Sequence, residues 1–310
     1  MGWARHRGRG IACGGDRRGG SHDPPSGSRR NSAARRRIAQ VTVGSLLLVH
    51  AHPDDEAIST GGVMMKAKAH GHRVVLITAT RGEVGEIYNM DEAASRPRLG
   101  EIRAAELKAA GEILGVDRQE FLGYRDSGMV DTADNKDPHS FHQAPLEEAA
   151  ARLAVFLREE RPDVVVTYGE DGIYGHPDHI KAHYVTNAAL DTLAHDGLPI
   201  KKLYYTAVPR SMMEEFAKQM PEEARRTQNP NMRIAGTPDE LVTTRVDVHD
   251  YVEAKRDAFR AHVSQNDPNS WFATMASQIY ELAFGTEYYQ LARGKPGSDL
   301  PEPDLFAGIS

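Results

Sequence analysis

Residues 46–56 read LLLVHAHPDDE, an apolar run followed by two imidazoles and three carboxylates. The run at 46–49 predicts a buried strand, so His52, Asp54 and Asp55 fall at its C-terminal end. Open α/β sheets bind their ligands at that edge. Carboxylates so close together raise one another's pKa values unless a cation neutralises them. A bound divalent metal ion is therefore the simplest interpretation of this cluster.

A second cluster, YGHPDH at residues 174–179, follows a second apolar run at 164–168. In a parallel sheet the ends of both strands face the same edge, so the two clusters can meet in space. Histidine and aspartate with one open coordination position are typical ligands of a catalytic zinc. A helix N-terminus rich in acidic residues is the plainer alternative, but it leaves His52 unexplained.

The identity of the third metal ligand is left open by spacing alone. His179 and His183 are four residues apart, which puts them on nearby surface of one helix. His179 is preferred because it begins the helix, nearest the crevice. We expect His183, and likewise His50, to pack near the site or support it.

Strand-like and helix-period segments alternate along the chain up to about residue 207. This alternation predicts an α/β fold with a Rossmann-like, mainly parallel sheet flanked by helices. The part after Pro209 is expected to be mostly helical, with an edge strand at 241–248. The predicted strands are 46–50, 74–78, 121–124, 164–168 and 202–207, and the predicted helices are 57–70, 98–114, 146–159 and 179–194.

Residues 1–43 differ from the rest and are predicted to be a disordered Arg/Gly-rich tail, followed by a single domain at 44–310. The first forty residues hold ten Arg, no Lys and two Asp. A solvated extension is preferred for this tail over an RNA-binding or anion-binding arm. The chain carries a net charge of −6, whereas residues 41–310, with 28 basic and 42 acidic side chains, carry −14. We therefore expect no nucleic-acid partner.

Other function classes are disfavoured by missing patterns. No apolar run approaches the ~18 residues of a membrane span, so no membrane partner is expected. Cys13 is the single cysteine, which excludes a disulfide within one chain. A cytoplasmic location is expected, because cleavage of an export signal near Ala51 would remove the first strand. The first strand is not followed by Gly-x-Gly-x-x-Gly, which disfavours a dinucleotide site.

The motifs together resemble the LmbE-like (PIG-L) zinc-dependent N-deacetylase family, and its mycothiol branch in particular. The resemblance spans nearly all of residues 45–185, and it implies an LmbE-like fold. That branch contains the GlcNAc-inositol deacetylase and the mycothiol S-conjugate amidase. The matching segments are VHAHPDDE at 49–56, GEVGE at 82–86, Arg103 with Glu106, DSG at 126–128, YGHPDH at 174–179, and more weakly 255–265 and 304–308.

The resemblance implies one zinc ion, with Fe²⁺ as the alternative, held by His52, Asp55 and His179. It also implies Asp54 as the general base and His176 beside the scissile carbonyl. A charged His176 would stabilise the oxyanion.

The chemistry of the neighbouring side chains predicts further roles around this centre. Asp178 would pair with His176 and keep it protonated, and Tyr174 would add a donor. The family resemblance implies that Arg103 binds substrate and that Asp126 contacts a polyol. For Arg103 the alternative is a surface ion pair with Glu106 of little energetic consequence.

The predicted function is thus hydrolysis of the N-acyl bond of an N-acetylglucosamine-type substrate such as GlcNAc-inositol. The expected partner is a small-molecule amino-sugar conjugate, and a homo-oligomer is compatible with the sequence. The alternatives are a mycothiol S-conjugate amidase and a non-catalytic metal- or sugar-binding α/β module. A metallophosphoesterase is less favoured, because the carboxylates that a second metal requires are not evident.

Overall fold

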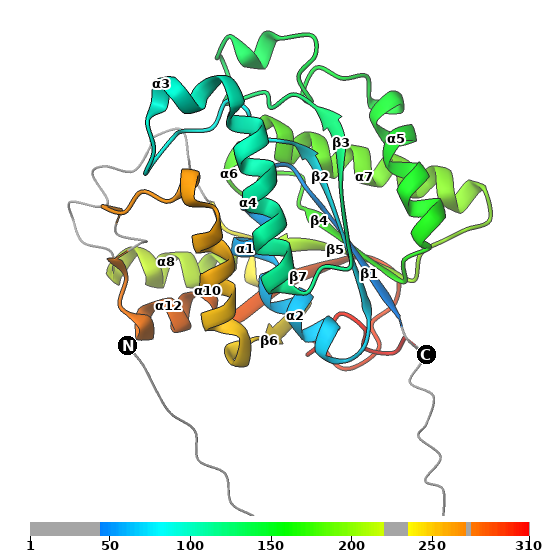
Figure 1. The fold of residues 1–310 in the computed structure, drawn as a ribbon. Coiled ribbons are helices and arrows are strands. Elements are labelled where there is room, and N and C mark those ends of the chain that lie inside the picture. The colour runs from blue at the N-terminus through cyan, green and yellow to red at the C-terminus, as the bar shows by residue number, and fades with distance from the viewer. Residues whose placement is uncertain (1–43, 220–234, 271–273, 310) are drawn as a thin grey trace, which may run out of the picture. The chain divides into compact units, whose positions relative to one another are not determined.

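The computed structural model describes residues 44–219, 235–270 and 274–309. The predicted tail and Cys13 lie outside the described residues. Within them, one sheet has the strand order β3-β2-β1-β4-β5-β7-β6 (Figure 1). The strands are β1 (Ser45–His50), β2 (Arg73–Thr80), β3 (Arg118–Tyr124), β4 (Val164–Tyr168), β5 (Lys202–Ala207), β6 (Thr244–Asp247) and β7 (Thr286–Arg293).

The first five strands are parallel, whereas β7 pairs antiparallel with both β5 and β6. The mainly parallel α/β sheet predicted from the sequence is confirmed. The predicted edge strand is also confirmed, because β6 ends the sheet. The helices are α1 (Asp55–Ser59), α2 (Gly61–Ala69), α3 (Glu92–Ser95), α4 (Leu99–Leu114), α5 (Leu146–Glu160), α6 (Gly172–Gly175), α7 (Pro177–His195), α8 (Arg210–Gln219), α10 (Val252–Ala261) and α12 (Ser277–Phe284).

The alternation of side chains along β1 separates two hydrophobic cores. Leu47 and Val49 point to the face covered by α5 and α7. Leu46 and Leu48 point to the opposite face, covered by α2, α4 and α10 (Figure 1). Because successive strand residues point to opposite faces, a strand with helices on both sides is apolar throughout. The sheet is thereby buried on both faces, and its carboxyl edge supplies the open surface.

Two sequence predictions are corrected in detail. The single helix expected at 57–70 is two helices, α1 and α2, which meet at Thr60. The Thr60 hydroxyl donates to the carbonyl of Glu56 and contacts His50 Nε2 at 2.9 Å. The C-terminal part holds the expected helices, but it also holds β7, which the sequence did not predict.

A buried carboxylate on β7 fixes this strand to the rest of the fold. Glu287 is 4% exposed and accepts hydrogen bonds from the backbone N–H groups of Gly62 and Val63, at 2.8 and 2.9 Å. It therefore closes the N-terminus of α2, where unpaired N–H groups favour an anion. Lys255 of α10 neutralises it at 2.6 Å, and Tyr289 donates to it at 2.8 Å.

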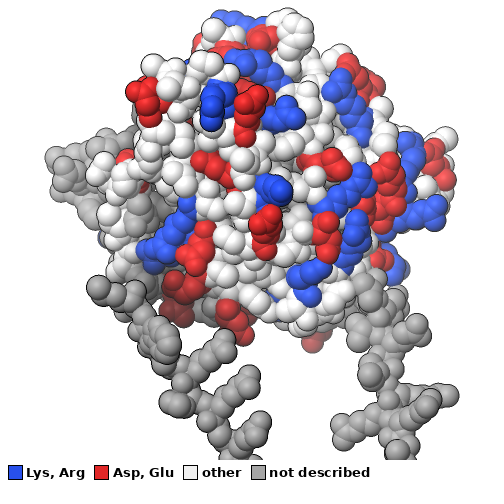
Figure 2. Space-filling view, viewed as in Figure 1, with Lys and Arg blue, Asp and Glu red and all other residues white. Residues whose placement is uncertain are grey.

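Acidic and basic side chains are interspersed on the face shown in Figure 2. Arg118, for example, contacts both Glu159 and Glu160 at 2.9 Å. None of the described helices is both long enough and apolar enough to cross a membrane.

Candidate metal centre

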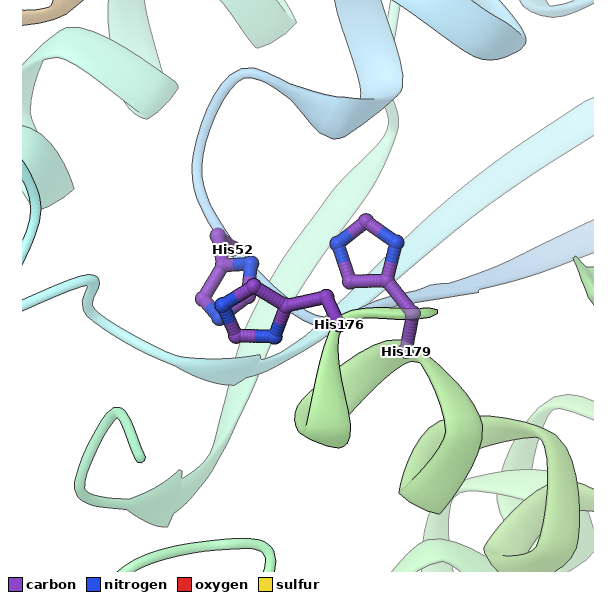
Figure 3. Close-up of side chains that lie close together, drawn as sticks. All are labelled: His52, His176 and His179. Carbon is purple, nitrogen blue, oxygen red and sulfur yellow. The ribbon is translucent and has the colours of Figure 1, made fainter. Parts of the chain in front are cut away.

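Two chain segments bring the predicted site together at the carboxyl edge of the sheet. His52, Asp54 and Asp55 lie where β1 leads into α1, and His176 to His179 lie where α7 begins. Because β1 and β4 are parallel neighbours, their ends are adjacent. Figure 3 shows the rings of His52, His176 and His179 lying close together. A ring nitrogen from each lies within 4.8 Å of the others.

Asp55 lies between two of these histidines. Its Oδ1 is 3.3 Å from His179 Nε2, and its Oδ2 is 3.5 Å from His52 Nδ1. Burial alone would raise the pKa of Asp55, but His179 and His52 hold it well below its usual range. Asp55 is therefore an ionised carboxylate, with one oxygen facing each ring. The three residues named as ligands from the sequence are in mutual contact.

Tyr168, the last residue of β4, supports both Asp55 and His179. Its hydroxyl donates to Asp55 Oδ2 at 2.7 Å and accepts the N–H of Ala51 at 2.8 Å. Its ring stacks on the ring of His179, with the ring centroids 4.2 Å apart. Tyr168 is not among the predicted site residues. The available signal was a tyrosine that ends a largely apolar strand at the ligand-binding edge.

His179 provides the evidence that the centre accommodates a metal ion. It is 1% exposed, and neither of its ring nitrogens makes a hydrogen bond, although Nε2 lies 3.3 Å from Asp55 Oδ1. Buried polar atoms are rarely left unpaired, so an orphaned imidazole needs an explanation. A cation at this place would supply the missing partner. The surrounding group of His52, His176, His179, Asp126 and Asp178 could hold a metal ion.

Asp126 and Asp178 flank His52 on the side away from Asp55. Asp178 Oδ2 lies 3.2 Å from His52 Nε2 and accepts the N–H of Ser127 at 2.9 Å. Asp126 Oδ1 lies 3.5 Å from the same nitrogen and accepts the N–H of Gly128 at 2.8 Å. Burial would lower the pKa of His52, but these carboxylates raise it well above its ordinary value.

The expected pairing of the Asp178 carboxylate with His176 is wrong, because that carboxylate is engaged by His52 and Ser127. His176 instead accepts the backbone N–H of Asp178 at its Nδ1, over 3.1 Å. Burial, together with His52 and His179, lowers the pKa of His176 to about 2. His176 is therefore neutral and carries its proton on Nε2. The expected charged imidazole is replaced by a neutral hydrogen-bond donor.

Asp54 adopts a left-handed backbone conformation, with φ 108°, just before α1. Its side chain is 22% exposed, and one oxygen lies 3.2 Å from the guanidinium of Arg103. Burial raises the pKa of Asp54 to about 6, although Arg103 opposes this shift. Such a carboxyl group exchanges a proton near neutral pH, as a general base requires.

Arg103 is buried, at 3% exposed, so the surface ion pair with Glu106 is wrong as an alternative. Its terminal nitrogens donate to the carbonyls of Gly82 and Pro53, at 2.9 and 2.5 Å. Glu106 bonds Ser264 instead. Arg103 thus clamps the loop that carries Asp54.

The remaining aromatic residues complete the surroundings. The ring of Tyr174 lies 5.0 Å from that of His179, centroid to centroid, and burial raises its pKa, so its hydroxyl stays protonated. His183 Nδ1 contacts the carbonyl of Tyr168 at 3.0 Å, which makes it a supporting residue rather than a facing ligand. His50 is fully buried, and its Nδ1 lies 3.2 Å from the hydroxyl of Tyr168, which in turn bonds Asp55.

A Rossmann-like sheet with a buried His/Asp cluster beyond β1 and β4 defines a class of α/β proteins with a candidate metal centre. Comparison with known proteins narrows this class. Residues 47–190 match the family model described as PIG-L, GlcNAc-PI de-N-acetylase. The chain belongs to this family and is a deacetylase, because named deacetylases match it over most of its length.

Curated relatives extend the match well beyond the family model. The chain is 45% identical to the 1D-myo-inositol 2-acetamido-2-deoxy-alpha-D-glucopyranoside deacetylase of Acidothermus cellulolyticus, covering 86% of this chain and 96% of the relative. It is 43% identical to the protein of the same name from Salinispora arenicola, covering 85% and 91%. Among solved structures, the N,N'-diacetylchitobiose deacetylase of Pyrococcus horikoshii has a TM-score of 0.56 at 21% identity, covering 81% of this chain and 84% of that one. The predicted LmbE-like fold is confirmed.

Proposed function

We propose that this protein hydrolyses the acetamide bond of 1D-myo-inositol 2-acetamido-2-deoxy-alpha-D-glucopyranoside, releasing acetate and the free amine. The observation that carries the proposal is the contact of Asp55 with both His52 and His179, beside a carboxyl group suited to proton transfer, Asp54. The substrate follows from the names of relatives that match 84–86% of the chain.

His52, Asp55 and His179 would hold the metal, and zinc is proposed because two imidazoles and one carboxylate are typical of its catalytic sites. Iron(II) is the alternative. The orphaned nitrogens of His179 fit this assignment. When bound, the ion would polarise the acetamide carbonyl and lower the pKa of the attacking water.

The protein's own residues would move the protons and hold the developing charge. Asp54 accepts the proton of the attacking water and passes it to the leaving amine. The Nε2–H of His176 donates to the carbonyl oxygen as that oxygen becomes negative, with Tyr174 as a second donor. Asp178 takes part only indirectly, because its N–H fixes the tautomer of His176 and its carboxylate holds His52.

Arg103 and Asp126 are proposed to recognise the sugar and the polyol, as the family resemblance implies. Asp126 lies on the segment that follows β3 and is 3.5 Å from His52. Its ionised carboxylate can accept hydrogen bonds from hydroxyl groups. Arg103 borders the site through its contact with Asp54.

The test uses the full chain, stripped of metal by chelation and then reloaded with zinc or iron(II). Free amine is measured from GlcNAc-inositol and, in parallel, from a mycothiol S-conjugate. We expect restored turnover on GlcNAc-inositol with one metal per chain. Full activity in metal-free protein would refute the metal assignment, and preference for the S-conjugate would favour the amidase alternative. A cytoplasmic location and the oligomeric state stay predictions.

A further inference from the structure

A buried pair of side chains, Glu56 and His262, lies directly behind Asp54. Both side chains are fully buried, and Glu56 Oε1 is 2.6 Å from His262 Nε2. The other oxygen of Glu56 accepts the backbone N–H of Asp54 at 2.9 Å. Glu56 thus connects the C-terminal part of the chain to the backbone of the proposed base. His262 lies outside residues 47–190, which the family model matches.

The backbone that this pair holds is strained. Asp54 has φ 108°, a conformation that is unfavourable for a residue with a Cβ atom and persists only where surrounding contacts impose it. The imposing contacts are visible. Glu56 accepts its N–H, its carbonyl accepts the N–H groups of Ala57 and Ile58, and Arg103 binds its carboxylate. The direction of the Asp54 side chain depends on this turn.

His262 is itself held in place by contacts that do not involve Glu56. Two residues on, the backbone N–H and the hydroxyl of Ser264 each donate to Glu106 over 2.7 Å. Gln265 donates to the carbonyl of Glu86 at 3.0 Å, and Tyr88 N–H donates to the carbonyl of Ser264 at 2.8 Å. The segment is anchored to α4 and to the loop after β2, so it can hold Glu56 in one position.

We propose that Glu56 and His262 act as a positioning pair, which fixes the left-handed turn at Asp54 and so aims its carboxylate at the attacking water. The inference rests on the proposed function in one respect, namely that Asp54 is the base. His262 secures Glu56 in one rotamer, and Glu56 secures the N–H of Asp54. A purely structural role would instead affect the folded state as a whole and leave Asp54 untouched.

His262→Phe removes the hydrogen bond and keeps the ring volume. We expect kcat to fall by about 10–100-fold, as small misplacements of catalytic groups do, with KM and metal content near those of the parent protein. His262→Gln, whose amide can still donate to Glu56, should recover most of that loss. If His262→Phe does not fold, His262→Asn provides the same test, because its shorter amide falls short of Glu56.

Ser264→Ala is the matched control. It removes the hydroxyl bond to Glu106 from the same buried segment but leaves the bond between His262 and Glu56. The backbone N–H of Ser264 still donates to Glu106, and Tyr88 N–H still donates to the carbonyl of Ser264, so the segment keeps its place. We therefore expect Ser264→Ala to lower thermal stability and to leave kcat unchanged. If Ser264→Ala lowers kcat as much as His262→Phe does, docking of the segment explains the effect and the pair has no positioning role.

The deciding measurement combines His262→Phe with Asp54→Asn. If the pair acts through Asp54, His262→Phe should cause no further loss of kcat once the base is gone, since residues that act as a unit are strongly non-additive. Equal losses in both backgrounds overturn the proposal. A crystal structure of His262→Phe gives a readout without turnover. Asp54 should leave positive φ, and an unchanged turn overturns the inference even if the substrate assignment fails.

Discussion

Asp54→Asn separates the chemistry of the base from metal binding. Asparagine keeps the size of the side chain and an oxygen that can accept from Arg103, but it cannot take a proton. We expect kcat to fall by ~10²–10⁴-fold, the usual contribution of a general base, with metal content unchanged. In the parent protein, kcat/KM should rise with pH as Asp54 loses its proton, with a midpoint at pH 6 or below. Burial raises the pKa of Asp54 to about 6, and a bound cation would lower it.

The same substitution should stabilise the metal-free protein. Burial raises the pKa of Asp54 from 3.8 to about 6, so keeping it ionised in the folded state is unfavourable. A shift of about two units corresponds to about 3 kcal/mol. Below pH 3.8 the carboxyl group is protonated in both the folded and the unfolded state, so its raised pKa has no unfavourable effect on stability. As the pH rises through 6, the folded state must hold the charge in a buried place and loses stability. The Asn variant should therefore gain up to about 3 kcal/mol at pH 7.5 and nothing at pH below 3.8.

Urea unfolding of the metal-free parent and variant at the two pH values measures this difference in stability. Metal analysis and steady-state kinetics measure the metal content and kcat. Near-parent activity with metal bound would refute Asp54 as the base and transfer that role to another group. Loss of metal from Asp54→Asn would show that Asp54 is a ligand. A stability difference independent of pH would refute the assigned pKa.

Three further predictions follow from the ligands, the core and the tail. Asp55→Asn should weaken metal affinity, so excess zinc partly restores its activity, and full metal retention would contradict the ligand assignment. Lys255→Met leaves Glu287 buried without its counter-charge and should cost about 3–5 kcal/mol in urea unfolding, whereas Arg260→Met, which breaks an exposed pair, should cost under about 1 kcal/mol. Deleting residues 1–40 should change neither kcat nor the melting temperature, and a large loss of either would show that the tail contacts the body.

Much of the fold was predictable because a buried strand or helix face requires a recognisable pattern of apolar residues within its own segment. Strands β1 and β4 are apolar at successive positions, since both of their faces are covered. β7 was missed because its inward-facing positions include Glu287, a charged residue that is acceptable there only beside Lys255 and the N-terminus of α2. That partner is 32 residues away, so no local window shows that the carboxylate is neutralised.

In the site, likewise, the ligands could be recognised from local motifs, but the residues that support them are distant in sequence. His52, Asp55 and His179 could be named because two short motifs end two predicted strands, and topology alone brings such ends together. Which groups orient them depends on side-chain contacts between segments that the sequence does not connect. Tyr168 meets Asp55 across 113 residues and His262 meets Glu56 across 206. Similarly, the charge of His176 was misjudged because burial and the two neighbouring histidines lower its pKa, while the carboxylate of Asp178 turns to His52. The motifs therefore identify the reacting groups, whereas contacts between distant segments set the protonation state and orientation of each group.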